Sequence, residues 1–317
     1  GSPNVAREHG FIASPSPSYP SREQAHHLRG RPDGRLQNSP WADIWLARAR
    51  LQGAAQLAGL AGVPIDVRHL QDWICGRTPP PRASEGLNDP VSVAAVFHLA
   101  IEASVSDKGP LARAALNVLR TVLDDRSEAE VWAGGDLAYF GPAWRQARIE
   151  TQAPYSSPTL HAVADRIAAM LETVVVAEQS AVDVTAIDGR TLTLEPRVRD
   201  RAWLVASHVP AMLHHAGLTL GTLPSLILLP KFPPQEVGEL IDVMMRSLLA
   251  TCQSGLKDLD WIERQGSQAL PVSATRRSRA PLLARLALAY PGLRPSAVAR
   301  LLEVTPQGAR KLVAKLA

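Results

Sequence analysis

The sequence predicts a mainly α-helical protein: a multi-helix body that carries one β-hairpin, followed by a C-terminal helix-turn-helix module. Two patterns support this fold class. Apolar residues recur at helical spacing over most of residues 40–266, and Pro or Gly separates the periodic segments. Around Asp188-Gly189 the period changes to alternation over about 182–195, which is the strongest short-range signal for a hairpin.

Four segments follow from these patterns. Residues 1–39 are rich in Pro, Ser, Gly, Arg and His and have no apolar period, so they predict a disordered tail. Residues 40–266 predict the helical domain, residues 267–278 a linker, and residues 279–317 the helix-turn-helix module. A linker is expected where Gly, Ser, Gln and Pro accumulate without a period.

Composition excludes several classes of protein. The 317 residues, 46% of them apolar, suffice for one large or two smaller domains. Cys75 and Cys252 give neither a disulfide framework nor a CxxC metal motif, which indicates a reducing compartment. No run of about eighteen apolar residues is present, so we expect no membrane span and a cytoplasmic protein.

The C-terminal module has the most detailed local signals. A first apolar helix ends at Pro291-Gly292, and a second begins at Pro295. Thr305 and Pro306 then supply an N-cap and a first-turn proline for a third helix. Three short helices with these ends are typical of a helix-turn-helix.

Individual positions fit the motif with one exception. Ala299 provides a small side chain where the two helices must approach closely, while Ala309 and Leu312 face inward on the third helix. Glu303 falls on the left-handed residue of the turn, where Gly is usual, at a cost of about 1 kcal/mol. A three-helix cap that binds nothing would show much of the same pattern.

The distribution of charge favours a nucleic-acid partner over such a cap. Residues 271–317 hold nine Lys or Arg and one acid, a net charge of +8. Residues 41–270 carry −6 and residues 1–40 carry +2, within a total of +4. A mildly acidic body with a strongly basic end is the asymmetry expected when one module meets DNA.

The expected contacts follow from the motif. Gln307 and Arg310, on the outward face of the third helix, are expected to read base edges in the major groove. Phosphates are assigned to Lys311 and to an arginine arm before the first helix. The predicted DNA-binding residues are Arg276, Arg277, Arg279, Arg294, Thr305, Pro306, Gln307, Arg310 and Lys311.

The sequence supports a catalytic or metal site less well than it supports a DNA-binding module. His208, His214 and His215 lie within eight residues, but the i, i+7 spacing of His208 and His215 is too long for two ligands of one metal on a helix, so partly buried structural histidines are expected. Asp258 and Asp260 fit a solvated or ion-paired helix surface. No Ser-His-Asp order, Walker loop or GxGxxG sequence is present. We therefore predict no catalytic residue, no metal ligand and no cofactor, and a protein that is not an enzyme.

Four short segments of the C-terminal third stand out: residues 228–230 (Leu-Leu-Pro), 255–261 (Gly-Leu-Lys-Asp-Leu-Asp-Trp), 278–282 (Ser-Arg-Ala-Pro-Leu) and 304–305 (Val-Thr). On these segments, residues 228–317 resemble an uncharacterised, plasmid-associated family of alphaproteobacteria. It implies a helical domain of unknown function before a helix-turn-helix, with DNA as partner. The body is also distantly similar to the N-terminal helical region of Fic proteins, but the Fic His-Pro-Phe and Gly-Asn-Gly-Arg motifs are absent.

Together these observations predict a sequence-specific DNA-binding protein that regulates transcription of plasmid or mobile-element genes. We expect a nucleoid-associated homodimer on double-stranded DNA, whose helical body dimerises or binds a small-molecule or protein effector. Two alternatives stay open: an adaptor whose basic tail only localises it, and an enzyme with an unrecognised site in the body.

Overall fold

The centre of the fold is the alanine-rich helix α2 (Ala42–Leu60). Small side chains let other elements approach it closely: a Cβ added at Gly53 would lie 2.3 Å from the carbonyl oxygen of Pro224. Buried residues occupy most of its circumference, as expected for a helix that is enclosed by others. The computed structural model describes residues 32–79, 89–103, 109–124, 141–173, 182–185, 191–194, 202–268 and 278–315.

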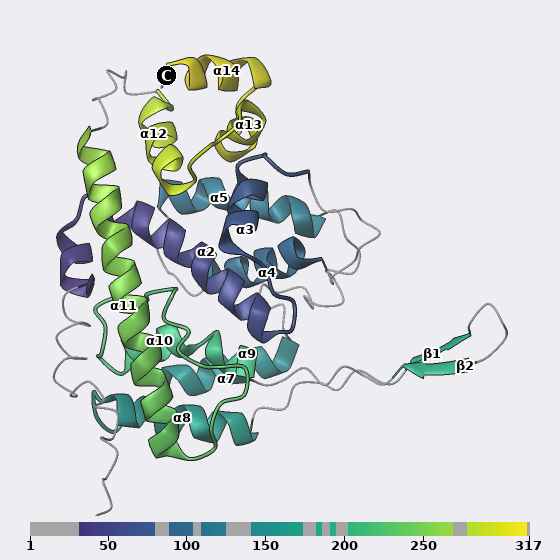
Figure 1. Cartoon of the computed structure of the whole chain (residues 1–317), viewed down its shortest axis with the longest axis vertical. Coiled ribbons are helices and arrows are strands. Elements are labelled where there is room, and N and C mark those ends of the chain that lie inside the picture. The colour runs from purple at the N-terminus through teal and green to yellow at the C-terminus, as the bar shows by residue number, and fades with distance from the viewer. Residues whose placement is uncertain are drawn as a thin grey trace, which may run out of the picture.

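Several helices pack around α2, and the helical elements confirm the mainly α class. In Figure 1, α12, α13 and α14 lie at one end of the molecule, α8 lies toward the other end, and α11 runs along one side. Helices α3, α4, α5, α9, α11 and α12 all contact α2. Their bounds are α3 (Val67–Ile74), α4 (Pro90–Ala103), α5 (Pro110–Asp124), α7 (Gly141–Gln152), α8 (Leu160–Thr173), α9 (Ala202–Ala206), α10 (Val209–His215), α11 (Val237–Gln268), α12 (Ala280–Ala289), α13 (Pro295–Leu302) and α14 (Pro306–Ala314).

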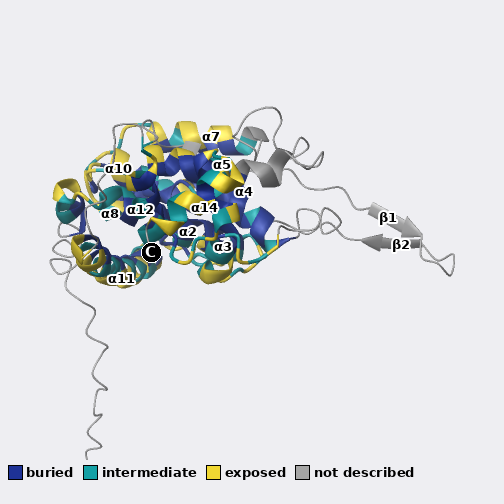
Figure 2. Cartoon of the chain, turned by 90° about the horizontal axis from the view of Figure 1, so that it is seen from above, coloured by how far each residue is buried: buried dark blue, intermediate teal, exposed yellow. Residues whose placement is uncertain are grey.

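One hydrophobic core joins these helices. It includes residues of α2, α4 and α5 together with Leu283, Leu286 and Tyr290 from α12 and its end. Figure 2 shows the buried residues gathered in the middle of the molecule and exposed residues on the outer faces of α7 and α11. Each fully buried Leu contributes about 1.5–3 kcal/mol. The C-terminal helices therefore share the core of the body.

Two short strands lie within the segment for which a hairpin was predicted. β1 (Val182–Thr185) pairs antiparallel with β2 (Thr191–Leu194), with Val182 opposite Leu194 and Thr185 opposite Thr191. This register leaves residues 186–190, which include Asp188-Gly189, between the two strands.

Ordered structure begins earlier than the sequence predicts. Residues 32–38 form a short helix inside the segment predicted as a disordered tail. Its Leu36 is buried, and its Arg35 forms ion pairs with Asp260 at 2.8 Å and Glu263 at 2.7 Å on α11. This helix is held on the body by ion pairs to α11 and by one buried Leu. The sequence therefore shows no apolar period here. Residues 1–31 lie outside the described residues.

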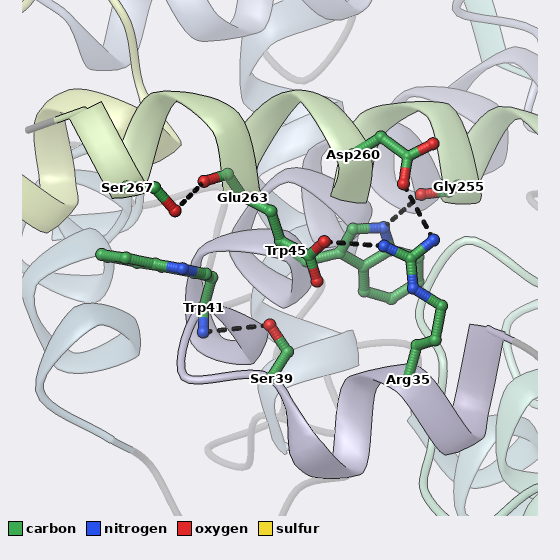
Figure 3. Close-up of polar contacts among 8 residues, drawn as sticks. All are labelled: Arg35, Ser39, Trp41, Trp45, Gly255, Asp260, Glu263 and Ser267. Carbon is green, nitrogen blue, oxygen red and sulfur yellow. Dashed lines mark hydrogen bonds and ion pairs between the residues drawn. The ribbon is translucent and has the colours of Figure 1, made fainter.

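Helix α11 also extends beyond its predicted end. It continues to Gln268, two residues into the segment predicted as a linker. Figure 3 shows how α2 holds this helix: the indole N–H of Trp45 donates to the carbonyl of Gly255 at 2.8 Å. A Cβ at Gly266 would lie 2.6 Å from the ring of Trp41, so the helix can pass Trp41 only with glycine there. Residues 269–277 of that segment lie outside the described part of the chain.

Candidate nucleic-acid interface

The turn between α13 and α14 has the geometry that the sequence predicts. Glu303 is left-handed, with φ 52° and ψ 47°, although it is not glycine. The N–H of Val304 donates to the carbonyl of Ala299 at 3.0 Å, which closes the end of α13. The Thr305 side chain then accepts a hydrogen bond from the N–H of Gly308 at 3.1 Å, as an N-cap does. Three residues thus redirect the chain from one helix into the next.

Helix α14 presents a polar face to solvent and packs through a small apolar one. Ala309 is completely buried. Gln307, Arg310 and Lys311 are exposed, and their spacing of three and four residues places them on one side of the helix. Thr305 and Pro306, at the start of the helix, are exposed as well. In Figure 1, α14 lies at the end of the molecule, with α12 and α13 between it and the body.

The positive charge of this region is not neutralised by the described part of the body. Among the described residues, five cations of the C-terminal helices are exposed and form no ion pair: Arg294, Arg300, Arg310, Lys311 and Lys315. Glu303 is the single acid in the sequence from 278 to 315. An uncompensated group of cations of this kind attracts a polyanion.

Arg285 is one of the nine Lys or Arg residues of residues 271–317, but it has a structural role. Its Nε donates to Asp43 at 2.9 Å and its Nη2 to the carbonyl of Pro40 at 2.6 Å. The guanidinium also lies 5.1 Å from the centre of the Trp41 ring. Because Trp41 in turn contacts Gly266 of α11, these contacts join α2, α11 and α12. Arg285 is therefore committed to the fold, and the net charge of +8 overstates what is free to bind.

Hydrogen bonds to α3 and α5 fix the C-terminal helices on the body. The amide of Gln71 donates to the carbonyl of Pro291 at 3.3 Å, and that of Asn117 donates to the carbonyl of Leu301 at 3.1 Å. The N–H of Arg294 donates to the carbonyl of Cys75 at 3.0 Å. Burial raises the pKa of the Cys75 thiol to about 12, so this thiol stays protonated and unreactive within the contact.

The remaining predicted residues are placed as follows. Arg294 is the N-cap residue of α13, and its side chain is exposed. Arg279 is the N-cap residue of α12, and it lines a hollow beside α5 together with Arg113. Arg276 and Arg277 lie outside the described residues. The structure thus brings Thr305, Pro306, Gln307, Arg310 and Lys311 together on α14, while Arg279 faces the junction with α5.

Of the three neighbouring histidines, His208 is buried, whereas His214 and His215 are exposed. The Nε2 of His208 lies 3.3 Å from the carbonyl of Trp144, and burial lowers the pKa of this histidine to about 4. The Nδ1 of His214 lies 3.2 Å from the carbonyl of Thr219. Within the described ranges, no three His, Cys, Asp or Glu side chains gather as a metal site, and no helix is long and apolar enough to cross a membrane.

Comparison with known proteins adds no relative. No family model matches the chain, and no match was found among the curated proteins or the solved structures. The resemblance to a plasmid-associated family thus stays a prediction, and the assignment of the interface depends on the geometry above.

Sequence reasoning did not single out Arg113 or Asn117, which face the C-terminal helices from α5. In the sequence they are two polar positions of an amphipathic helix. No local signal distinguishes such residues from solvated ones, because their partners are more than 150 residues away in the chain.

Proposed function

We propose that the protein binds double-stranded DNA in a sequence-specific manner through α14 and regulates transcription. One observation carries the proposal: Gln307, Arg310 and Lys311 form an exposed face on a helix that follows a left-handed turn and an N-cap. Ala309 holds the opposite side of this helix in the core. The face is therefore both presented to solvent and fixed in orientation.

The chemistry of that face suits the major groove. Arg can donate two hydrogen bonds to O6 and N7 of guanine, and Gln can pair with N6 and N7 of adenine. Thr305 caps the helix, so its first turn directs free N–H groups and a partial positive charge toward a phosphate. Lys311, one turn after Gln307, supplies a further cation for the backbone. We assign base reading to Gln307 and Arg310, and phosphate contact to Lys311.

A homodimer is part of the proposal. One helix-turn-helix reads only a few base pairs, so such proteins gain selectivity by binding two half-sites with two copies. The genes involved would be those of a plasmid or mobile element, the setting that the sequence resemblance implies. The protein would then act on the nucleoid in the cytoplasm.

The test is selection of bound duplexes from a random DNA library by the full chain. We expect enrichment of an inverted repeat whose half-sites lie about one helical turn, or a multiple of it, apart. The double variant Gln307→Ala, Arg310→Ala should lose this enrichment, while Arg246→Ala, an exposed arginine of α11, serves as the matched control. Absence of any enriched sequence, or the same repeat selected by the double variant, would refute the proposal.

A further inference from the structure

A hollow of about 500 Å³ lies at the junction where α5 of the body meets α12 and α13. Its wall is formed by α5, by the start of α12 and by the end of α13, including the turn residue Glu303. This volume lies within the range of small-molecule sites, roughly 300–1,000 Å³. The hollow has no part in the α14 face that is proposed to bind DNA.

The lining of the hollow has a polar side and an apolar side. Arg113 and Arg279 bring two guanidinium groups from separate helices, against the single carboxylate of Glu303. Leu282, which is partly exposed, supplies the apolar side, and the buried Leu301 and Leu302 lie behind it. None of the ion pairs among the described residues involves Arg113 or Arg279. A ligand that satisfies this lining carries one anionic group and an apolar part.

We propose that this hollow binds a small organic carboxylate, with the carboxylate on Arg113 and Arg279 and the apolar part on Leu282. Arginine suits the first contact because its planar guanidinium can donate two parallel hydrogen bonds to a carboxylate. The occupied site bridges the body and the helix-turn-helix.

Occupation of the hollow also regulates DNA binding, an inference that rests on the proposed function. The amide of Asn117 already joins α5 to the carbonyl of Leu301, and Glu303 is the turn residue from which the chain enters α14. A ligand on both walls strengthens this junction and holds α14 in place, so less ordering remains to be done when DNA binds. The acid therefore raises the affinity for DNA, by roughly 5- to 150-fold if the coupling is of ordinary size.

Calorimetry on the full chain, without DNA, tests the site. The probes are octanoate, 4-phenylbutanoate and indole-3-propanoate, each compared with its uncharged primary amide. We expect one acid or more to bind with 1:1 stoichiometry and a Kd below about 1 mM. The amide of that acid should bind roughly 10-fold more weakly, as should the acid to Arg113→Gln. Arg246→Gln, which changes an exposed arginine on α11, should bind the acid like the parent.

Three results would overturn the site: no acid binds, the amides bind as well as the acids, or Arg113→Gln, folded by circular dichroism, binds the acid unchanged. A DNA titration with and without the acid then tests the coupling, which an unchanged or reduced affinity contradicts. If Arg113→Gln weakens DNA binding in the absence of acid, the hollow contacts a DNA phosphate and the carboxylate assignment is wrong. Acid binding without any DNA binding would leave the site standing and defeat the proposed function alone.

Discussion

Positively charged side chains have opposite roles where residues 32–60 pack on α11 and on the outer face of α14. The first of these regions is called the joint below. At the joint, Arg35 pairs with two carboxylates of α11, and Arg48 pairs with Asp258 at 2.6 Å. On α14, Arg310 and Lys311 are exposed and pair with no described residue. The donors of a paired arginine are already used in contacts within the protein. An unpaired arginine can instead neutralise a DNA phosphate and so release the counterions bound there.

Arg285 shows that position, and not residue type or neighbouring sequence, decides between the two uses. It lies in the basic C-terminal region, yet it is held by Asp43 and Trp41 in the manner of the joint. Charge counted along the sequence cannot make this distinction, because the partners are 242 residues away. Predictions that separate the two regions test this interpretation.

The largest effect on stability is expected when the pH is lowered. It arises from two buried histidines of the helical body. Burial lowers the pKa of His98 to about 3 and that of His208 to about 4, from an ordinary value of 6.5. At a pH between the folded pKa of each histidine and 6.5, the unfolded chain binds more protons than the folded one. The free energy of unfolding should therefore fall as the pH drops below about 6.5, by up to about 1.4 kcal/mol per pH unit for each histidine.

Denaturant unfolding at several pH values between 7 and about 4.5 measures this loss. His98→Leu should reduce the pH dependence by about half, because one of the two buried histidines is gone. The control is Gln56→Leu, which changes an exposed side chain of α2 that does not titrate and should leave the dependence unchanged. An undiminished pH dependence in His98→Leu would show that this histidine is not kept neutral by the fold.

A smaller effect is expected from one substitution made at two glycines. At Gly266 an added Cβ would lie 2.6 Å from the Trp41 ring, so Gly266→Ala should destabilise the protein by about 1–3 kcal/mol. At Gly59, in α2, nothing lies within 4 Å of such a Cβ. Gly59→Ala should therefore stabilise the protein by about 0.5–1 kcal/mol, as Ala does in helices. Thermal unfolding of both variants compares the signs, and a destabilised Gly59→Ala with an unaffected Gly266→Ala would contradict the packing described here.

These glycines also show what the sequence can and cannot predict. The left-handed turn at Glu303 and the N-cap at Thr305 were predictable, because their signals lie within a few residues of each other. The contact of Gly266 with Trp41 could not be predicted, because a glycine near the end of a helix indicates the start of a linker in the sequence. Local geometry was accessible from the sequence, and the long-range packing partners were not.

The candidate site divides in the same way. The exposed positions of α14 follow from helical spacing, and the structure places Gln307, Arg310 and Lys311 on one face as expected. The hollow at Arg113 had no signal, because it forms only when α5 meets residues of α12 and α13. Residues that face each other across such a junction share no pattern in the sequence.

The smallest stability effect is expected at the arginines themselves. Arg285→Gln loses the pairing with Asp43 and the contact with Trp41, at a cost of about 1 kcal/mol for this partly exposed pair. Arg300→Gln, also in the C-terminal helices but exposed and unpaired within the described residues, should change stability by less than about 0.5 kcal/mol. Chemical denaturation distinguishes the two, and equal losses would mean that Arg285 is no more committed to the fold than Arg300.

The central claim, that the face of α14 reads DNA, is tested most directly by measuring the affinity of Arg310→Ala for a panel of duplexes that differ at single positions of the selected site. The claim predicts a loss of about 1–3 kcal/mol on the best site, relaxed preference at one base pair, and unchanged folding stability. Arg246→Ala should bind the whole panel as the parent does. If Arg310→Ala also binds every duplex like the parent, with its preferences intact, α14 is not the element that reads DNA.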